Sequence, residues 1–361
     1  MRGIKILALG ILATTANTVI TGAETGLQNE ACVLNVSNQG GAITSFVLKD
    51  SPVNPLLWEL TREDMPENNR KGAPFRGHFL CLGRWGDPTP GEKMSGMPNN
   101  GDTAALTWQA DSADDFSLVL RCNSDMDYIE AVREFNLDSN APLYLATDRV
   151  KNTATIGRLF NIVQHATLGS PFLSRSLLVN TNAGKGFMQD NHLPSPELHA
   201  YGWPQGKLSS GKTVDLRKSD GEASYVSSHI FTDSIGWVTA ISPESRLLIG
   251  YVWKTSDYPW LNVWHQTKDG KPWAKGLEFG TTGLGQPYDK LLGMASEFFG
   301  NNSFFFFDAG EVMEKKFVSF IIEVPENFEN AEHLTIDGQR LVIKGKDNVT
   351  LEIKSELLKQ L

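Results

Sequence analysis

Residues 31–50, ACVLNVSNQGGAITSFVLKD, decide the class of fold. Two runs of apolar and β-branched residues, 31–37 and 42–50, flank the sequence NQGG. Asparagine and paired glycines favour a tight reversal of the chain between two strands. The stretch therefore predicts an antiparallel β-hairpin.

The same pattern recurs along the rest of the chain, and helical periodicity is almost absent. Further predicted strands are 116–122, 128–137, 143–152, 158–168, 176–181, 237–242, 246–254, 260–266, 276–282, 303–310, 315–324, 334–338, 340–345 and 349–354. Residues 288–300, YDKLLGMASEFFG, predict one short helix. So many strands with tight turns predict an all-β fold: a large antiparallel two-sheet β-sandwich with one or two short helices. No linker divides residues 24–361, which we expect to form a single domain.

Residues 1–23 have the pattern of a secretory signal peptide. Arg2 and Lys5 precede a short apolar run, and Thr21 and Ala23 have the spacing of a signal-peptidase site. The alternative is a buried N-terminal strand or helix. Cleavage would leave an exported protein, periplasmic or secreted, and no later apolar run is long enough to insert into a membrane.

Charge and cysteine content exclude several classes of function. The net charge of −9 becomes −11 when Arg2 and Lys5 are removed, which does not favour nucleic acid or anionic membrane surfaces as partners. Three scattered cysteines are too few for a disulfide scaffold. They form at most one disulfide, or three buried thiols, and they are Cys32, Cys81 and Cys122.

Two long stretches, 62–104 and 182–222, are rich in glycine, proline and asparagine. Long irregular segments in a compact domain usually carry function or are disordered. Both contain Trp, His and Arg, which disordered segments seldom gather. We expect them to form the walls of a site.

Glu278 is a lone acid in the sequence KGLEFGTTG. A carboxylate partly desolvated by Leu277, Phe279 and Trp273 would have a raised pKa, which suits a general acid or base. The alternative is a carboxylate that accepts hydrogen bonds from the glycine-rich turn. His165 ends an apolar alternating run, and because the unperturbed pKa of histidine is near 6.5, it is a second candidate for proton transfer. A lone histidine on a strand is more often structural than catalytic.

Arg84 and Trp85 place a guanidinium beside an indole ring in LGRWG. A rigid donor group beside an aromatic face suits a sugar, whose hydroxyls take the hydrogen bonds while its apolar face stacks. An Arg stacked on a Trp at the base of a loop is as common. Trp260 offers a further aromatic surface. His192, Glu197 and His199 could hold zinc, but the prolines between them prevent a regular helical spacing, and we predict no metal and no organic cofactor.

The chain resembles the aldose 1-epimerase, or galactose mutarotase-like, family. The resemblance rests on NQGGAITSFVLKD, LGRWG, FNIVQHATLGSPF, GLEFGTTG and DAGEVMEKKFVSFIIEV, in that order. It implies the supersandwich fold of that family, with Arg84 binding sugar hydroxyls and with His165 and Glu278 as catalytic residues.

The chain departs from the family pattern at two places. The usual His-Gly element is replaced by Asn100-Gly101, so Asn100 would bind hydroxyls without transferring a proton. The family's hydroxyl-binding Asp has no clear counterpart in this chain, and the two candidates for it are Asp233 and Asp257.

The resemblance implies interconversion of sugar anomers. Glu278 would take the proton of the anomeric hydroxyl while His165 protonates the ring oxygen. One alternative is a carbohydrate-binding protein without turnover. Another is a hydrolase or lyase that acts on a glycan with the same fold.

Overall fold

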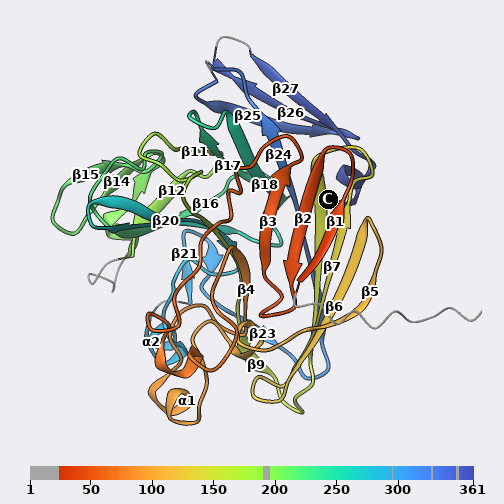
Figure 1. Cartoon of the computed structure of the whole chain (residues 1–361). Coiled ribbons are helices and arrows are strands. Elements are labelled where there is room, and N and C mark those ends of the chain that lie inside the picture. Colours follow the sequence, from red (N-terminus) through yellow and green to blue (C-terminus); the bar gives the residue numbers. More distant parts are fainter. Residues whose placement is uncertain (1–23, 190–195, 295, 327, 347–348) are drawn as a thin grey trace, which may run out of the picture.

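The computed structural model describes residues 24–189, 196–294, 296–326, 328–346 and 349–361. The predicted signal peptide, 1–23, lies outside the described residues. Most of the chain forms two large sheets that face each other (Figure 1). Every pair of neighbouring strands in them is antiparallel. The predicted all-β two-sheet sandwich is therefore confirmed.

The larger sheet has ten strands. In spatial order they are β1 (Glu24–Gln28), β2 (Cys32–Ser37), β3 (Ile43–Leu48), β4 (His78–Leu82), β10 (Ile162–Leu168), β20 (Lys271–Gly280), β19 (Trp260–Lys268), β16 (Tyr225–Ile230), β12 (Lys185–Met188) and β13 (Tyr201–Gly202). The hairpin predicted from residues 31–50 is β2–β3. Gly40 and Gly41 turn it with φ of 70° and 61°, a backbone conformation that glycine adopts without steric cost.

The second sheet has eight strands. In spatial order they are β11 (Leu178–Thr181), β17 (Ile235–Ser242), β18 (Leu247–Lys254), β24 (Val312–Glu323), β8 (Leu143–Asn152), β7 (Ile129–Leu137), β6 (Ser117–Ser124) and β5 (Gln109–Ala113). The main core lies between the two sheets. At its centre the ring of Phe279 stacks on Trp253 at 4.2 Å between centroids, and this contact joins the two sheets.

A separate three-stranded sheet covers the outer face of the eight-stranded sheet (Figure 1). Its strands are β25 (Ala331–Asp337), β26 (Arg340–Gly345) and β27 (Thr350–Lys354). Leu334, Leu341 and Ile343 from this sheet form a second apolar cluster with Val318 and Phe320 of β24. Burial on both sides explains why β24 is apolar at consecutive positions rather than at alternate ones.

The remaining elements are short. The two-stranded pairs are β9 (Arg158–Phe160) with β23 (Phe305–Phe307), β14 (Gln205–Lys207) with β15 (Thr213–Asp215), and β21 (Glu297–Phe298) with β22 (Asn301–Asn302). The helices are α1 (Pro90–Met94) and α2 (Tyr288–Gly293), and the 3₁₀ turns are Glu67–Asn69, Asp102–Ala104, Pro196–His199 and Glu356–Gln360. Among the described residues, no helix is both long and apolar enough to cross a membrane.

The two helices differ in how well the sequence predicts them. The predicted helix 288–300 begins correctly at Tyr288 but ends at Gly293, where Met294 takes an extended conformation. The sequence analysis missed α1, which lies in the Gly- and Pro-rich stretch. It is started by a capping box, in which Thr89 and Glu92 each bond the other's backbone, and by Pro90 in its first turn.

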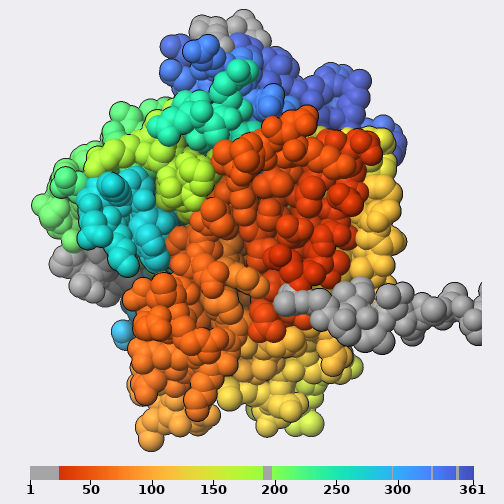
Figure 2. Space-filling view, in the orientation of Figure 1, coloured from red at the N-terminus to blue at the C-terminus, as the bar shows by residue number. Residues whose placement is uncertain are grey.

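Irregular segments between β3 and α1 cover part of the outer face of the ten-stranded sheet. Trp58, Phe75 and Trp85 form a third apolar cluster there with Phe79 of β4 and Val163 of β10. Figure 2 shows these segments in orange, spread over one side of the molecule. Because both faces of the sheet are covered, all seven residues of β10 are buried. The prediction that residues 62–104 form a wall of a functional site stays a prediction.

Candidate functional site

His165 and Glu278 lie directly opposite each other on neighbouring strands. The antiparallel register of β10 and β20 pairs the two residues, so their side chains lie on the same face of the sheet. His165 Nε2 is 3.2 Å from Glu278 Oε1. The fold thus brings together the two residues that the sequence proposes for proton transfer, although 113 positions separate them.

The pair faces away from the main core. Leu277 and Phe279, on either side of Glu278, belong to the cluster between the sheets, and side chains alternate along a strand. His165 and Glu278 therefore point toward the covered outer face. The Phe79 ring stacks on His165 at 4.1 Å, and Trp264 meets the imidazole edge-on at 5.8 Å.

Burial changes the protonation of both partners. It raises the pKa of Glu278 well above its usual value, and the Trp85 side chain offsets this rise only in part. It lowers the pKa of His165 to about 3. Both shifts disfavour charge, so they favour a protonated Glu278 carboxyl beside a neutral His165 imidazole. The other ring nitrogen, Nδ1, lies 3.0 Å from Thr167 Oγ1 and fixes the orientation of the ring.

Two buried acceptor atoms next to the pair form no hydrogen bond with the described residues. They are Glu278 Oε2 and Asn262 Oδ1. Asn262 stands opposite Glu278 on β19, and its Nδ2 donates to Thr282 O at 3.1 Å. Leaving a buried acceptor unpaired costs free energy. Both atoms therefore keep an unused capacity to accept a hydrogen bond.

The row of polar side chains continues one strand further. Ser228 of β16 stands opposite Asn262, and its hydroxyl accepts a hydrogen bond from Gln189 Nε2 at 2.6 Å. The sequence analysis missed Asn262 and Ser228. The available signal was a polar residue inside an otherwise apolar strand, as in WLNVW, but that signal does not reveal the face of the sheet.

A glycine makes room for the carboxyl of Glu278. A Cβ atom on Gly276 would lie 2.4 Å from Glu278 Oε1, closer than a van der Waals contact allows. Gly276 is two residues before Glu278 on β20 and so lies on the same face. Any larger side chain there would displace the carboxyl.

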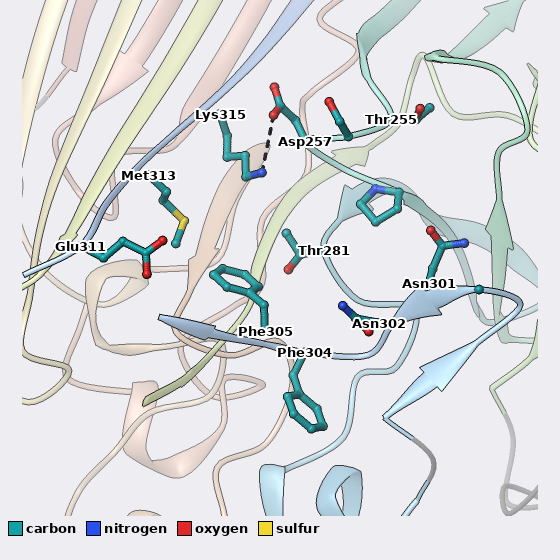
Figure 3. A pocket seen from close by; sticks show the side chains of 13 residues that line it. Thr255, Asp257, Thr281, Asn301, Asn302, Phe304, Phe305, Glu311, Met313 and Lys315 are labelled. Atoms are coloured by element: carbon teal, nitrogen blue, oxygen red, sulfur yellow. Dashed lines mark hydrogen bonds and ion pairs between the residues drawn. The ribbon is translucent and has the colours of Figure 1, made fainter. Parts of the chain in front are cut away.

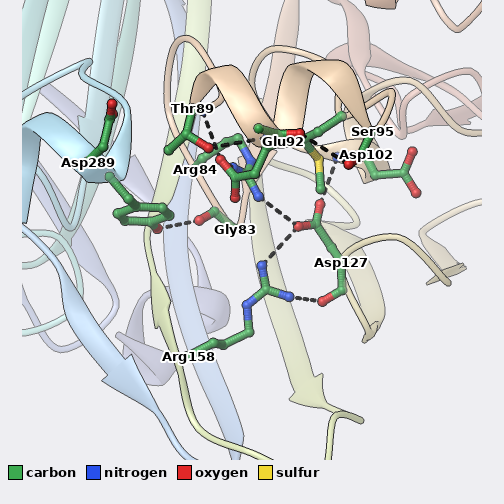
Figure 4. Close-up of polar contacts among 12 residues, drawn as sticks. Gly83, Arg84, Thr89, Glu92, Ser95, Asp102, Asp127, Arg158 and Asp289 are labelled. Carbon is green, nitrogen blue, oxygen red and sulfur yellow. Dashed lines mark hydrogen bonds and ion pairs between the residues drawn. The ribbon is translucent and has the colours of Figure 1, made fainter.

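Arg84 is occupied by protein carboxylates (Figure 4). Its Nη1 lies 2.7 Å from Glu92 Oε2 and its Nη2 lies 3.2 Å from Asp127 Oδ1, and the side chain is only 4% exposed. Asp127 also pairs with Arg158 at 3.0 Å and accepts from the backbone N–H of Asp102 at 2.8 Å. In this arrangement Nη1 and Nη2 of Arg84 bond protein carboxylates and brace the loop that bears Trp85, while the buried Nε has no partner among the described residues.

Asn100 also stabilises this loop. Its Oδ1 accepts from Gly86 N at 2.8 Å, and its own N–H donates to Gly86 O at 3.0 Å. Its φ is 65°, which asparagine tolerates better than most residues. The next residue must be glycine, because a Cβ on Gly101 would lie 1.8 Å from Leu82 O. Asn100 therefore holds the turn that follows Trp85.

Trp85 is the member of the predicted binding group that lies at the pair. Its side chain lowers the pKa of the Glu278 carboxyl, in opposition to the larger effect of burial, and the residue is 8% exposed. Trp260 is fully buried and donates from Nε1 to Asn302 O at 3.1 Å. No face of Trp260 is open for stacking on a sugar.

The two candidate aspartates lie away from the His165–Glu278 pair, and each lines a cavity of its own. Asp257 lines a cavity at one end of the sandwich, where it pairs with Lys315 at 3.5 Å (Figure 3). Asp233 accepts a hydrogen bond from Asn182 Nδ2 at 2.9 Å and lines a cavity beside β25. The fold does not bring either aspartate to the row formed by His165, Glu278 and Asn262.

The sequence analysis also considered His192, Glu197 and His199 as an alternative zinc site and left the state of the three cysteines open. His192 lies outside the described residues, and the Glu197 carboxylate accepts from Phe299 N at 2.5 Å. Within the described ranges, no three His, Cys, Asp or Glu residues are grouped as a metal site. The three cysteines are free and buried; burial raises the pKa of Cys32 to about 12, so these thiols are unreactive.

No family model matches the chain, and no curated protein matches it. Many solved structures share its fold. The Slr1438 protein from Synechocystis sp. PCC 6803 superposes with a TM-score of 0.60 at 13% identity, over 86% of this chain and 100% of that one. The galactose mutarotase related enzyme from Lactobacillus acidophilus gives 0.59 at 11% identity, over 84% and 99%.

A third example is the galactose mutarotase-like protein from Lactobacillus casei ATCC 334, with a TM-score of 0.56 at 12% identity, over 83% of this chain and 100% of that one. The protein thus has the galactose mutarotase-like fold, as the sequence resemblance predicts. At such identities the likeness establishes the fold, and the chain is a divergent example of it.

Proposed function

We propose that the protein interconverts the anomers of a sugar by general acid–base catalysis at His165 and Glu278. The observation that carries the proposal is the buried contact of His165 with Glu278 at 3.2 Å, where burial favours one titratable proton, on the carboxyl. A reaction that removes one proton from a sugar while adding another needs one acid and one base at the same time, and a pair with a single proton provides both.

The proton must lie on His165 for the forward step. Burial favours the protonated carboxyl in the free protein, and the 3.2 Å contact allows the proton to cross to Nε2. A sugar hydroxyl that donates to Glu278 Oε2 would favour the carboxylate, since hydrogen bonds to the charged form stabilise it. Binding would then prepare the pair for reaction.

The chemistry follows from that form of the pair. Glu278 accepts the proton of the anomeric hydroxyl as His165 donates a proton to the ring oxygen, and the ring opens. After rotation of the aldehyde, the reverse transfers close the ring on its other face. Asn262 and Ser228 would bind neighbouring hydroxyls, and Trp85 would contact the apolar face of the ring.

A second candidate function is carbohydrate binding without turnover. It is favoured by the state of Arg84 and Asn100, because Nη1 and Nη2 of Arg84 bond protein carboxylates and Oδ1 of Asn100 accepts from the backbone of Gly86. Fewer groups are then left to hold a substrate in one orientation. Cleavage of a larger glycan at the same pair is the remaining alternative, and export to the periplasm or beyond stays a prediction from residues 1–23.

Anomeric exchange measured by saturation-transfer NMR on a panel of free aldoses tests the proposal. We expect the wild-type protein to accelerate exchange of at least one aldose and Glu278→Gln to lose that acceleration. Glu130→Gln is the matched control, because Glu130 is an exposed carboxylate on β7. Binding of a sugar without any acceleration would favour the second candidate.

A further inference from the structure

The cavity lined by Asp257 has the size and the polar lining of a small-molecule binding site. Its volume is about 430 Å³, within the range of small-molecule sites. Four separate segments form it: the turn between β18 and β19, the end of β20, residues 300–305, and the start of β24. Exposed residues at its edge, such as Ser256 and Glu311, open it to solvent.

The walls are held in place by bonds to the surrounding fold. The Thr255 hydroxyl donates to Asp233 O at 2.8 Å, and Thr281 Oγ1 donates to Asn161 Oδ1 at 3.0 Å. The backbone of Asn302 is fixed by the indole of Trp260. The cavity is therefore formed before any ligand arrives, which lowers the entropic cost of binding.

Its lining combines an aromatic surface with neutral and charged polar groups. Figure 3 shows the ring of Phe305 beside Thr281, below the ion pair of Lys315 and Asp257. The side chains of Asn301 and Asn302 lie on the other side of Thr281. Amides, hydroxyls, a carboxylate and an ammonium group around an aromatic ring form a set of donors and acceptors that matches a polyol.

The charges of the cavity decide between classes of ligand. Lys315 and Asp257 neutralise each other at 3.5 Å, and the carboxylate of Glu311 is partly used by the N–H of Asp308. An anion would meet two carboxylates, and a cation would meet the ammonium of Lys315. A neutral hydroxylated molecule can donate to the carboxylates and accept from the ammonium without a charge penalty.

We infer that this cavity is a second site, separate from the His165–Glu278 pair, and that it binds a neutral saccharide. Glu278 points to the outer face of the ten-stranded sheet, whereas the cavity lies at the end of the sandwich beyond Gly280, among residues of β24 and the turn after β18. The second site does not depend on the proposed reaction. It would hold a sugar unit or part of a larger glycan.

Saturation-transfer difference NMR titrations with glucose, galactose, maltose and methyl β-D-galactopyranoside test this inference. We expect Lys315→Met and Asn302→Ala to weaken binding of at least one probe by tenfold or more, and to leave anomeric exchange unchanged. The matched control is Lys316→Met, one position along β24, where the ammonium pairs with Glu314 instead. This control should bind like the wild-type protein.

The outcomes separate the two proposals. Binding that is unchanged in both Lys315→Met and Asn302→Ala would overturn the second site, as would a failure of all four probes to bind. Binding that depends on Lys315, in a protein that accelerates no anomeric exchange, would support the second site and contradict the proposed reaction.

Discussion

Acid should destabilise this protein strongly, because burial favours the neutral form of three histidines outside the His165–Glu278 pair in the folded state. Burial lowers the pKa of His229 and of His265 to about 4 each, and lowers that of His78 well below 6.5. In the unfolded chain each pKa returns to about 6.5. The unfolded chain therefore binds more protons between pH 6.5 and pH 4, and the free energy of unfolding falls as the pH falls through that window.

The magnitude follows from these shifts. At pH 5 an unfolded histidine is almost fully protonated, while a folded one with a pKa of about 4 is mostly neutral, which costs about 2 kcal/mol of stability relative to pH 7. His229 and His265 together should cost about 4 kcal/mol, a large part of the stability of many domains, and His78 adds to the loss in the same direction. His165 and Glu278 nearly cancel, since the pair retains one proton in the folded state.

Urea denaturation followed by tryptophan fluorescence at pH 7, 6 and 5 measures this loss. His229→Gln should reduce the loss between pH 7 and pH 5 by about 2 kcal/mol, because the contribution of that histidine is removed. His333→Gln, at an exposed position on β25, is the control and should leave the loss unchanged. A stability that is level from pH 7 to pH 5, or an equal loss in His229→Gln, would refute the reasoning.

Three further predictions test the site and its support. Gly276→Ala should push the Glu278 carboxyl aside and lower any anomeric exchange at least about tenfold. Gly184→Ala is the control and should leave exchange unchanged, because a Cβ at that position meets nothing within 4 Å. Equal exchange rates in the two variants would contradict the close contact between Gly276 and the carboxyl. Arg84→Met should lower the free energy of unfolding by about 3–5 kcal/mol, as for other buried ion pairs. The control Arg340→Met, at an exposed position, should change it little. Urea titration measures the free energy of unfolding of both variants. The three cysteines should resist a thiol reagent in the native protein and react together on unfolding; rapid labelling without denaturant would contradict their burial.

The sequence predicts the fold well because the signal is local and repeated. The hairpin of residues 31–50 depends on apolar runs around a glycine turn, and each later strand repeats that logic. The start of α2 was also predictable. The end of α2 and the whole of α1 were not, because a capping box between Thr89 and Glu92 outweighs the surrounding glycines and prolines.

The site is only partly predictable for a physical reason. His165 and Glu278 each stand out within a strand, but only the register of β10 and β20 pairs them. Asn262 joins them for the same reason, and nothing near it in sequence indicates which face it occupies. In the sequence alone Arg84 resembles a ligand-binding residue. In the folded protein its guanidinium bonds Asp127, which lies 43 positions away along the chain.

The central claim is that His165 and Glu278 act as one acid–base unit on a sugar. Saturation-transfer NMR of anomeric exchange on the wild-type protein, His165→Asn, Glu278→Gln and the double variant tests it most directly. We predict acceleration by the wild-type protein, loss in each single variant, and no further loss in the double variant, because residues that act as a unit are not additive. A wild-type protein that accelerates exchange of no aldose, or single variants that retain full exchange, would contradict the claim.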